Sequence, residues 1–360
     1  MTLTTPTLFR NGLVAAAIAM ATTIASAADV KLTGAGATFP QPLYERWTVE
    51  YQKQNPDVKI TYEGGGSGAG IKRITDKTCA FGASDAPLSE KEIEALGGTS
   101  AVIQFPTVAG GVVPAYNIPD FKGELKFTGE VIADIYLGKV SMWNDKAIAD
   151  LNPGVKLPAL AIAPAWRSDG SGTTYVFTSY LATQSKDFKS AVGAGKQVKW
   201  VAGTGGKGNA GVAAIITQTA GGFGYIEQNY AVANKIAYGS VKNAAGEFVK
   251  ATIPSMTAAG EGAVEKLKGS VLKADIWNQP GKTAYPITAF TYIIVNNDLR
   301  SVKTMEEAVT LKKFLAWALS DAGQKIASEM DYAPLSKGVQ KASQTALETV
   351  TFEGKPVSAK

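Results

Sequence analysis

Three short apolar segments in the first quarter of this chain each lead through a glycine-rich turn into a helical pattern. The segments are residues 30–32, 58–62 and 80–81, and glycine, alanine and hydroxyl residues follow each of them. A strand followed by a helix and then by another strand implies parallel pairing, with helices covering the faces of the sheet. Because parallel strands end at the same edge of a sheet, ligands bind at that edge. The sequence therefore predicts an α/β fold with a binding site where these turns meet.

Each of the three turns carries one polar side chain that a ligand could use, namely Thr38, Ser67 and Asp85. Glycine lets the backbone approach a ligand closely, and the N–H groups at the start of a helix favour an anion. Asp85 suits an anion only if that anion carries a proton that the carboxylate can accept. The residues leave a second interpretation open, in which Thr38 caps the following helix and Asp85 is a turn aspartate.

The stretch 166–174, Trp-Arg-Ser-Asp-Gly-Ser-Gly-Thr-Thr, repeats this pattern and adds an arginine. It follows an apolar run at 159–163 that is typical of a strand, and a helical run at 174–181 begins where it ends. The Arg167 guanidinium offers a planar fork of donors that matches an oxyanion. The stretch predicts the second half of an anion site, although an ordinary turn with a local Arg167–Asp169 surface pair explains it equally well.

The residue counts exclude several kinds of chemistry. The 360 residues include no histidine and one cysteine, Cys79, which excludes a Ser-His-Asp triad, an intramolecular disulfide and a His- or Cys-cluster metal site. The net charge of +5 contains no long basic block, which argues against nucleic-acid binding. We therefore expect no catalytic residue, no metal and no cofactor, and we expect Cys79 to be a buried structural thiol.

Residues 1–28 have the pattern of a secretory signal peptide. Arg10 precedes the apolar run 12–21, and small residues follow at 25–28. The apolar run is too short for a transmembrane anchor. We expect cleavage after Ala27 or Ala28 and export of a soluble mature protein.

Two glycine-rich loops match nucleotide-binding fingerprints by letter only. The loop 64–70 fits a variant dinucleotide pattern, but the acidic residue at the required distance is Asp85, which has a better use in the anion site. The loop 203–209 contains a Gly-Lys pair, yet glycine follows at position 208, where a P-loop requires serine or threonine. We expect the loop 203–209 to have a structural role at the rim of the site.

Taken together and in this order, these motifs resemble the phosphate-binding proteins of the bacterial phosphate-specific ABC importer, the PstS family. The resemblance covers nearly the whole mature chain. It departs from the family at Gly68, beside Ser67, where relatives often have a second serine. The segments that carry it are 32–40, 81–89 and 167–173, with support from 104–108, 134–139 and 205–209.

The resemblance implies the α/β fold of periplasmic-binding-protein type II, with two α/β lobes and a ligand cleft between them. The first lobe would combine residues 29–108 with 284–360, and the second would be 109–283. The implied function is that of a periplasmic solute-binding protein, and not an enzyme, that captures inorganic phosphate. Its implied partners are the membrane permease and ATPase subunits of the phosphate ABC importer, and we expect the protein itself to be a monomer.

The same resemblance assigns the ligand-binding residues, and it implies that Asp169 supports Arg167 from outside the ligand contact. Asp85 would accept the proton of phosphate and would repel fully ionised sulfate, which has none. Two other functions stay open: a secreted phosphatase or phosphate-transferring enzyme on this scaffold, and a receptor for another oxyanion such as sulfate or molybdate. The residues assigned to phosphate are Ala37, Thr38, Phe39, Ser67, Asp85, Arg167, Ser171, Gly172 and Thr173.

Overall fold

The computed structural model describes residues 1–2 and 30–358 of the chain. The predicted signal peptide, 1–28, therefore lies outside the described residues except for its first two. Within the described part, no helix has both the length and the apolar character needed to cross a membrane.

Strands and helices alternate along most of the described chain. The strands are β1 (Val30–Gly36), β2 (Val58–Gly64), β3 (Phe81–Ser84), β4 (Val102–Tyr116), β5 (Lys126–Phe127), β6 (Ala163–Arg167), β7 (Thr204–Gly206), β8 (Gly222–Glu227), β9 (Ala237–Tyr238), β10 (Ser240–Lys242), β11 (Phe248–Val249), β12 (Thr288–Asn296), β13 (Thr351–Phe352) and β14 (Lys355–Pro356). The helices are α1 (Gln41–Gln54), α2 (Ser67–Thr75), α3 (Glu90–Ala95), α4 (Gly129–Tyr136), α5 (Lys146–Ala149), α6 (Gly172–Gln184), α7 (Lys186–Ala191), α8 (Gly208–Gln218), α9 (Gln228–Ala233), α10 (Ile253–Ala259), the 3₁₀ helix η1 (Ala263–Lys266), α11 (Met305–Ala318), α12 (Asp321–Glu329) and α13 (Lys337–Glu348).

The main sheet has the strand order β2-β1-β3-β12-β4-β8-β6-β7, with β9 paired to β4. At one end β1 lies parallel to β2 and β3, which confirms the three parallel units predicted from the sequence. At the other end β6 lies parallel to β7 and β8. The middle of the sheet is antiparallel, because β12 runs against β3 and β4, and β4 runs against β8. Both ends of the sheet are thus parallel, and ligands bind at the carboxyl ends of such strands.

The long strand β4 joins the two ends of the sheet. The sequence predicts two strands here, at 101–106 and 111–117, and that prediction is wrong because the chain continues as one buried strand of 15 residues. Pro106 lacks an N–H group, and the pairing with β12 shifts register at Thr291/Tyr292 to accommodate it. The part of β4 up to Gly111 pairs with β12, and the part from Val112 pairs with β8, so β4 crosses from one lobe to the other.

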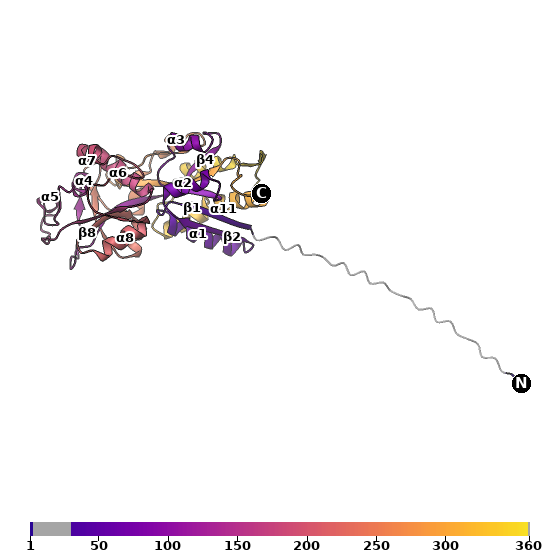
Figure 1. Ribbon diagram of the computed structural model, residues 1–360, viewed down its shortest axis with the longest axis horizontal. Coiled ribbons are helices and arrows are strands. Elements are labelled where there is room, and N and C mark those ends of the chain that lie inside the picture. The colour runs from indigo at the N-terminus through magenta and orange to yellow at the C-terminus, as the bar shows by residue number, and fades with distance from the viewer. Residues whose placement is uncertain (3–29, 359–360) are drawn as a thin grey trace.

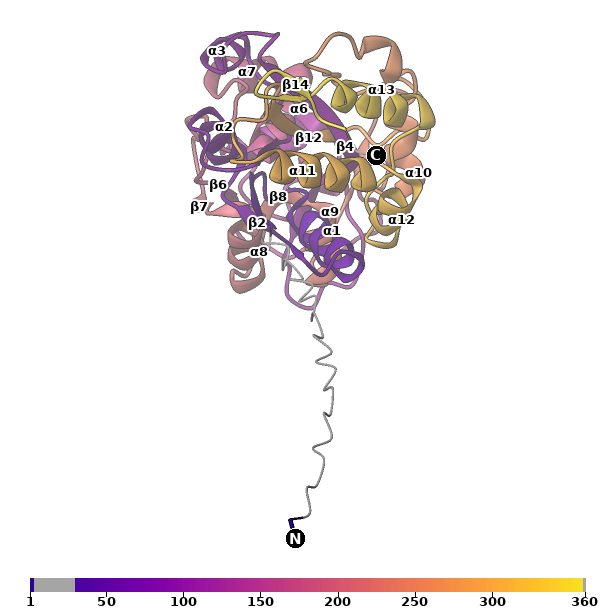
Figure 2. The same ribbon diagram turned by 90° about the vertical axis from the view of Figure 1, so that its right-hand side faces the viewer.

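Helices cover each half of the sheet separately and produce two lobes. Along the long axis of the molecule, α1, α2, α3 and α11 gather around β1 and β2, whereas α4 to α8 gather around β8 (Figure 1). Seen from the end that carries the C-terminus, α11 lies across the front with α13 above it and α1 and α12 below (Figure 2). The chain therefore has the two-lobed α/β architecture expected from its resemblance.

Each lobe has an aromatic core. In α1 the face predicted from Leu43, Trp47 and Tyr51 is buried, and Trp47 stacks on Tyr44 at a centroid distance of 5.2 Å. In the other lobe Trp143 is fully buried, as its packing role predicts, and its Nε1 donates to Gly221 O at 3.1 Å. These cores hold the strand ends in place, so that the loops beyond them can carry the ligand groups.

Two element boundaries differ from those that the sequence predicts. The strand expected at 159–163 lies at 163–167 instead, because β6 pairs with β7 through Arg167 and Gly206. The following helix begins at Gly172 and not at Thr174, since the Ser171 hydroxyl caps it by accepting from Thr174 N at 3.0 Å. Arg167 is consequently the last residue of a strand, which fixes its backbone.

Candidate ligand-binding site

The first lobe brings Thr38, Ser67 and Asp85 to one edge of the sheet. They follow β1, β2 and β3, which are adjacent and parallel, so the turns beyond these strands meet. The Ser67 hydroxyl accepts a hydrogen bond from Asp85 N at 3.2 Å, and both side chains are buried. The structure therefore brings Ser67 and Asp85 into contact and places Thr38 at the same edge of the sheet, as the sequence predicts.

Thr38 does not cap the helix that follows it. The N-cap position of α1 is Pro40, without a side-chain cap. The Thr38 hydroxyl instead accepts two hydrogen bonds from Asn209 of the other lobe, from N at 3.1 Å and from Nδ2 at 3.0 Å. This excludes the alternative in which Thr38 is a simple helix cap.

The neighbouring residues Ala37 and Phe39 are buried in the same turn. Ala37 N donates to Ala83 O at 3.0 Å, so this N–H is engaged within the lobe. Phe39 O accepts from the Tyr332 hydroxyl at 2.8 Å, which ties the turn to the C-terminal part of the chain. The turn after β1 is thus held on both sides.

The second lobe holds Arg167 in a buried ion pair. Its side chain is 1% exposed, and its Nε and Nη2 donate to the two carboxylate oxygens of Asp169 at 2.8 and 2.6 Å. Burial raises the pKa of Asp169, but the bonds from Arg167 and from Gly208 N outweigh burial and lower the pKa overall. The alternative of a surface pair is excluded, because the guanidinium lies in the interior and points its remaining donor, Nη1, at Thr173 Oγ1, 3.2 Å away.

The start of α6 meets the first lobe directly. Gly172 N donates to Ser67 Oγ at 3.0 Å, and Gly68 N donates to Gly170 O at 2.8 Å. The buried hydroxyls of Ser171 and Thr173 flank Gly172. The N-terminus of α6 therefore faces the loop that carries Ser67, and the N–H groups at a helix N-terminus favour an anion.

Asp85 of the first lobe lies beside Gly172 at this meeting point. It is 2% exposed, and its Oδ1 accepts from the Thr291 hydroxyl at 2.9 Å. Burial raises the pKa of Asp85 to about 7, against the opposing effects of the Thr291 bond and of the Arg167 charge. An ionised Asp85 is therefore costly here unless a ligand donates a hydrogen bond to it.

Two residues of this site are absent from the sequence-based prediction. Asn209 belongs to the loop for which only a structural role is expected, and it bonds Thr38 across the lobes. Thr291 lies in the middle of β12 and orients Asp85. The signal for Asn209 was its place at the start of a helix after a glycine-rich loop; Thr291 has no such signal, because every residue of β12 is buried.

Further contacts join the lobes around this site. Lys196 forms an ion pair with Glu92 of α3, and the carbonyl of Lys196 accepts from Ser171 N at 2.8 Å. On another side the Tyr230 hydroxyl donates to Thr38 O at 2.6 Å. The lobes are therefore closed on each other in this structure.

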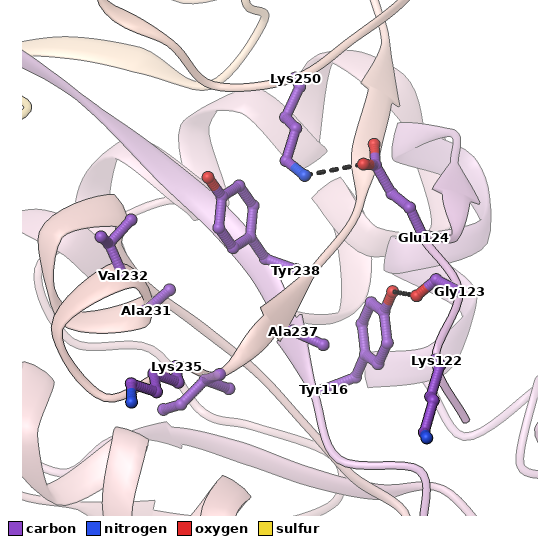
Figure 3. A pocket seen from close by; sticks show the side chains of 11 residues that line it. Tyr116, Lys122, Gly123, Glu124, Ala231, Val232, Lys235, Ala237, Tyr238 and Lys250 are labelled. Atoms are coloured by element: carbon purple, nitrogen blue, oxygen red, sulfur yellow. Dashed lines mark hydrogen bonds and ion pairs between the residues drawn. The ribbon is translucent and has the colours of Figure 1, made fainter. Parts of the chain in front are cut away.

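A hollow of about 460 Å³ lies elsewhere in the second lobe (Figure 3). It contains Lys122, Lys235 and Lys250, but Lys250 Nζ is paired with Glu124 at 2.7 Å and lies 4.9 Å from the centre of the Tyr238 ring. None of the ligand groups predicted from the sequence lines this hollow. Within the described residues there is also no group of three or more His, Cys, Asp or Glu side chains that could hold a metal ion. The cleft between the lobes is thus the candidate site.

Comparisons with known proteins identify the family of this chain. A family model described as a PBP superfamily domain matches residues 21–322. The phosphate-binding protein PstS of Pasteurella multocida is 41% identical over 320 residues, which cover 88% of this chain and 90% of the relative. This chain belongs to the PstS family. Another member, the phosphate-binding protein PstS of Haemophilus influenzae, is 42% identical over 311 residues, which cover 86% of this chain and 90% of the relative.

Solved structures share the fold of this PstS family member. A phosphate-binding protein from Stenotrophomonas maltophilia aligns with a TM-score of 0.64 at 17% identity, covering 88% of this chain and 93% of that one. A phosphate ABC transporter substrate-binding protein from Clostridium perfringens, with bound phosphate, aligns with a TM-score of 0.62 at 19% identity, covering 85% and 100%. Both named relatives in the PstS family are described as phosphate-binding proteins.

Proposed function

We propose that this chain captures inorganic phosphate between its two lobes and delivers it to the permease of an ABC importer. The observation that carries the proposal is the convergence of one buried guanidinium, several hydroxyls and a helix N-terminus on one carboxylate, Asp85, from both lobes. Membership of the PstS family supports the same ligand. A proton-bearing oxyanion satisfies both the donors and the acceptor of such a site.

We propose nine phosphate-binding residues, with Asp169 holding Arg167 in place. Hydrogen bonds to a charged group contribute about 1.5–3 kcal/mol each, so a few of them reach the roughly −8 kcal/mol of a micromolar dissociation constant after closure costs. The proposed ligand set is Ala37, Thr38, Phe39, Ser67, Asp85, Arg167, Ser171, Gly172 and Thr173.

We also propose that the protein works as an exported, periplasmic monomer whose closed form the permease and ATPase subunits recognise. The proposed lobes are 29–108 with 284–360, and 109–283. The hydrogen bonds of Gln104 with Ser270 and Leu272 support a refinement, because they attach the segment around 270 to the first-lobe part of β4. The return to the first lobe would then precede residue 270.

A calorimetric titration of the purified mature protein tests the function. We expect tight binding of phosphate and binding of sulfate that is at least about a hundredfold weaker, which corresponds to a few kcal/mol. Sulfate binding as tight as that of phosphate would contradict the role of Asp85. Release of p-nitrophenol from p-nitrophenyl phosphate, abolished by Ser67→Ala, would instead favour a phosphatase.

Replacing Gly172 with alanine should weaken phosphate binding by more than about tenfold. A Cβ atom at this position would lie 2.5 Å from Ser67 Oγ and 2.6 Å from Asp85 Oδ2, so the lobes could not close to the same extent. Gly260→Ala is the matched control, because the atom nearest to its added Cβ would be Thr257 O at 3.3 Å, which belongs to no proposed ligand group. Calorimetry with phosphate is the measurement, and equal affinities for Gly172→Ala and the wild type would contradict the proposed closure.

A further inference from the structure

Asn209 lies fully buried in the first turn of α8, in the second lobe, and contacts ligand groups of both lobes. We propose that Asn209 is a positioning residue that makes the hydroxyls of Thr38 and Thr173 donate to phosphate. This inference rests on the proposed function and adds to it a residue that does not touch the ligand.

Both acceptor positions of the Thr38 hydroxyl oxygen are occupied by hydrogen bonds from Asn209. A hydroxyl has two acceptor positions and one hydrogen to donate. Asn209 N and Asn209 Nδ2 donate to Thr38 Oγ1 at 3.1 and 3.0 Å, and occupy both acceptor positions. The Thr38 hydrogen is therefore directed away from Asn209, and an oxyanion in the cleft can accept it.

Thr173 is in the same situation in the second lobe. Its Oγ1 accepts from Arg167 Nη1 at 3.2 Å and from Asn209 Nδ2 at 3.4 Å. The two incoming donors again leave the hydroxyl hydrogen for the ligand. One amide nitrogen thus orients a donor from each lobe.

The orientation of the Asn209 amide is itself determined by the backbone. Glu227 N, at the end of β8, donates to Asn209 Oδ1 at 3.0 Å. A rotated amide would place its NH₂ group against the N–H of Glu227 and its oxygen against Thr38. The Thr38 hydroxyl would then donate its hydrogen to Asn209 Oδ1 and not to the ligand. The bond to Glu227 N therefore keeps both hydroxyls as donors.

The bonds from Asn209 to Thr38 also depend on lobe closure. Thr38 follows β1 in the first lobe, whereas Asn209 follows β7 in the second, and the two residues meet across the cleft. The donor direction at Thr38 is consequently set only when the lobes come together. Closure and alignment of the donors are one event, and this favours a ligand that can accept both hydrogens.

A double-mutant cycle tests the inference, with calorimetry using inorganic phosphate. We expect Asn209→Ala to weaken binding by about 10- to 100-fold, in the range of a lost hydrogen bond to a charged ligand. Asn209→Asp keeps the shape but accepts the hydroxyl hydrogens, so it should weaken binding at least as much. In a Thr38→Val/Thr173→Val background the effect of Asn209→Ala should fall to a few-fold at most, because no hydroxyl remains to be oriented.

Asn229→Ala is the matched control, since Asn229 Nδ2 also bonds across the lobes, to Met330 O at 3.0 Å, without a contact to either hydroxyl. We expect it to change phosphate affinity by a few-fold at most. A full Asn209→Ala effect in the Thr38→Val/Thr173→Val background, or no effect in the wild-type background, would overturn the inference while leaving the proposed function in place. Failure of the wild-type protein to bind phosphate would overturn both.

Discussion

Substitution of Arg167 by alanine is expected to weaken phosphate binding by more than tenfold. The guanidinium is 1% exposed and forms two bonds with Asp169, whose carboxylate would lose them and stand unpaired beside an anion. Truncating one partner of a buried charge pair costs about 2–5 kcal/mol, and each 1.4 kcal/mol is about tenfold in affinity. The effect should therefore exceed that of losing one neutral donor.

Two effects of Arg167→Ala must be separated, the loss of the Arg167 donors and the loss of the charge partner of Asp169. Arg167→Ala/Asp169→Ala removes both charges and should recover part of the affinity that Arg167→Ala alone loses. Arg300→Ala is a matched control, because Arg300 likewise pairs with an aspartate two positions away in the sequence, Asp298. The Arg300 side chain, however, is 61% exposed. Titration calorimetry gives the dissociation constants, and an unchanged value for Arg167→Ala would refute the assignment of Arg167.

The charge balance of the cleft explains why the neutral donors matter. Asp169 neutralises Arg167, so the pair as a whole brings no net positive charge to the ligand. Asp85 adds a potential negative charge on the opposite side. Attraction to the anion must then come largely from hydroxyls and from the N-terminus of α6. The helix dipole is fixed before the ligand arrives. Such a site selects by hydrogen-bond pattern more than by charge.

The sequence was sufficient to place the proposed ligand groups that follow parallel strands. Thr38, Ser67 and Asp85 each stand just beyond an apolar segment, and parallel pairing alone brings such positions together. Arg167 and the start of α6 were found by the same rule, although the strand before them ends four residues later than its apolar pattern suggests. Pairing with Gly206 of β7 sets that end, and pairing over such a distance leaves no local signal.

The groups that orient these residues could not be predicted in the same way. Asn209 and Thr291 act through contacts with residues 171 and 206 positions away in the sequence. Their local patterns, a glycine-rich loop and a continuously buried strand, are typical of structural segments. The continuity of β4 was not predicted for a related reason, because pairing with β12 continues on both sides of Pro106, with a register shift at Thr291/Tyr292. Tertiary pairing, and not local propensity, decides these features.

Replacement of Asp85 by asparagine is expected to reduce discrimination against sulfate by about a hundredfold or more, which corresponds to a few kcal/mol. An ionised Asp85 can accept the proton of phosphate but meets the bare oxygens of sulfate with like charge in a buried cleft. Asparagine removes this repulsion, and its Nδ2 can donate to sulfate while Oδ1 can still accept from phosphate. The main change should therefore be a gain in sulfate affinity.

The acidity of Asp85 adds a pH dependence to this prediction. Burial raises its pKa to about 7, and the protonated carboxyl, which predominates below that pH, can donate to sulfate. Sulfate binding by the wild type should thus strengthen as the pH falls through about 7, and Asp85→Asn should lose this dependence. Glu227→Gln is the matched control, because Glu227 is also fully buried with a pKa raised well above its usual range, yet its carboxylate bonds Asn229 N and Tyr332. The measurement is a pair of titrations, with phosphate and with sulfate, between pH 5.5 and 8.5, roughly 1.5 units either side of that pKa. The role of Asp85 would be contradicted if Asp85→Asn kept the wild-type ratio of the two affinities at the alkaline end.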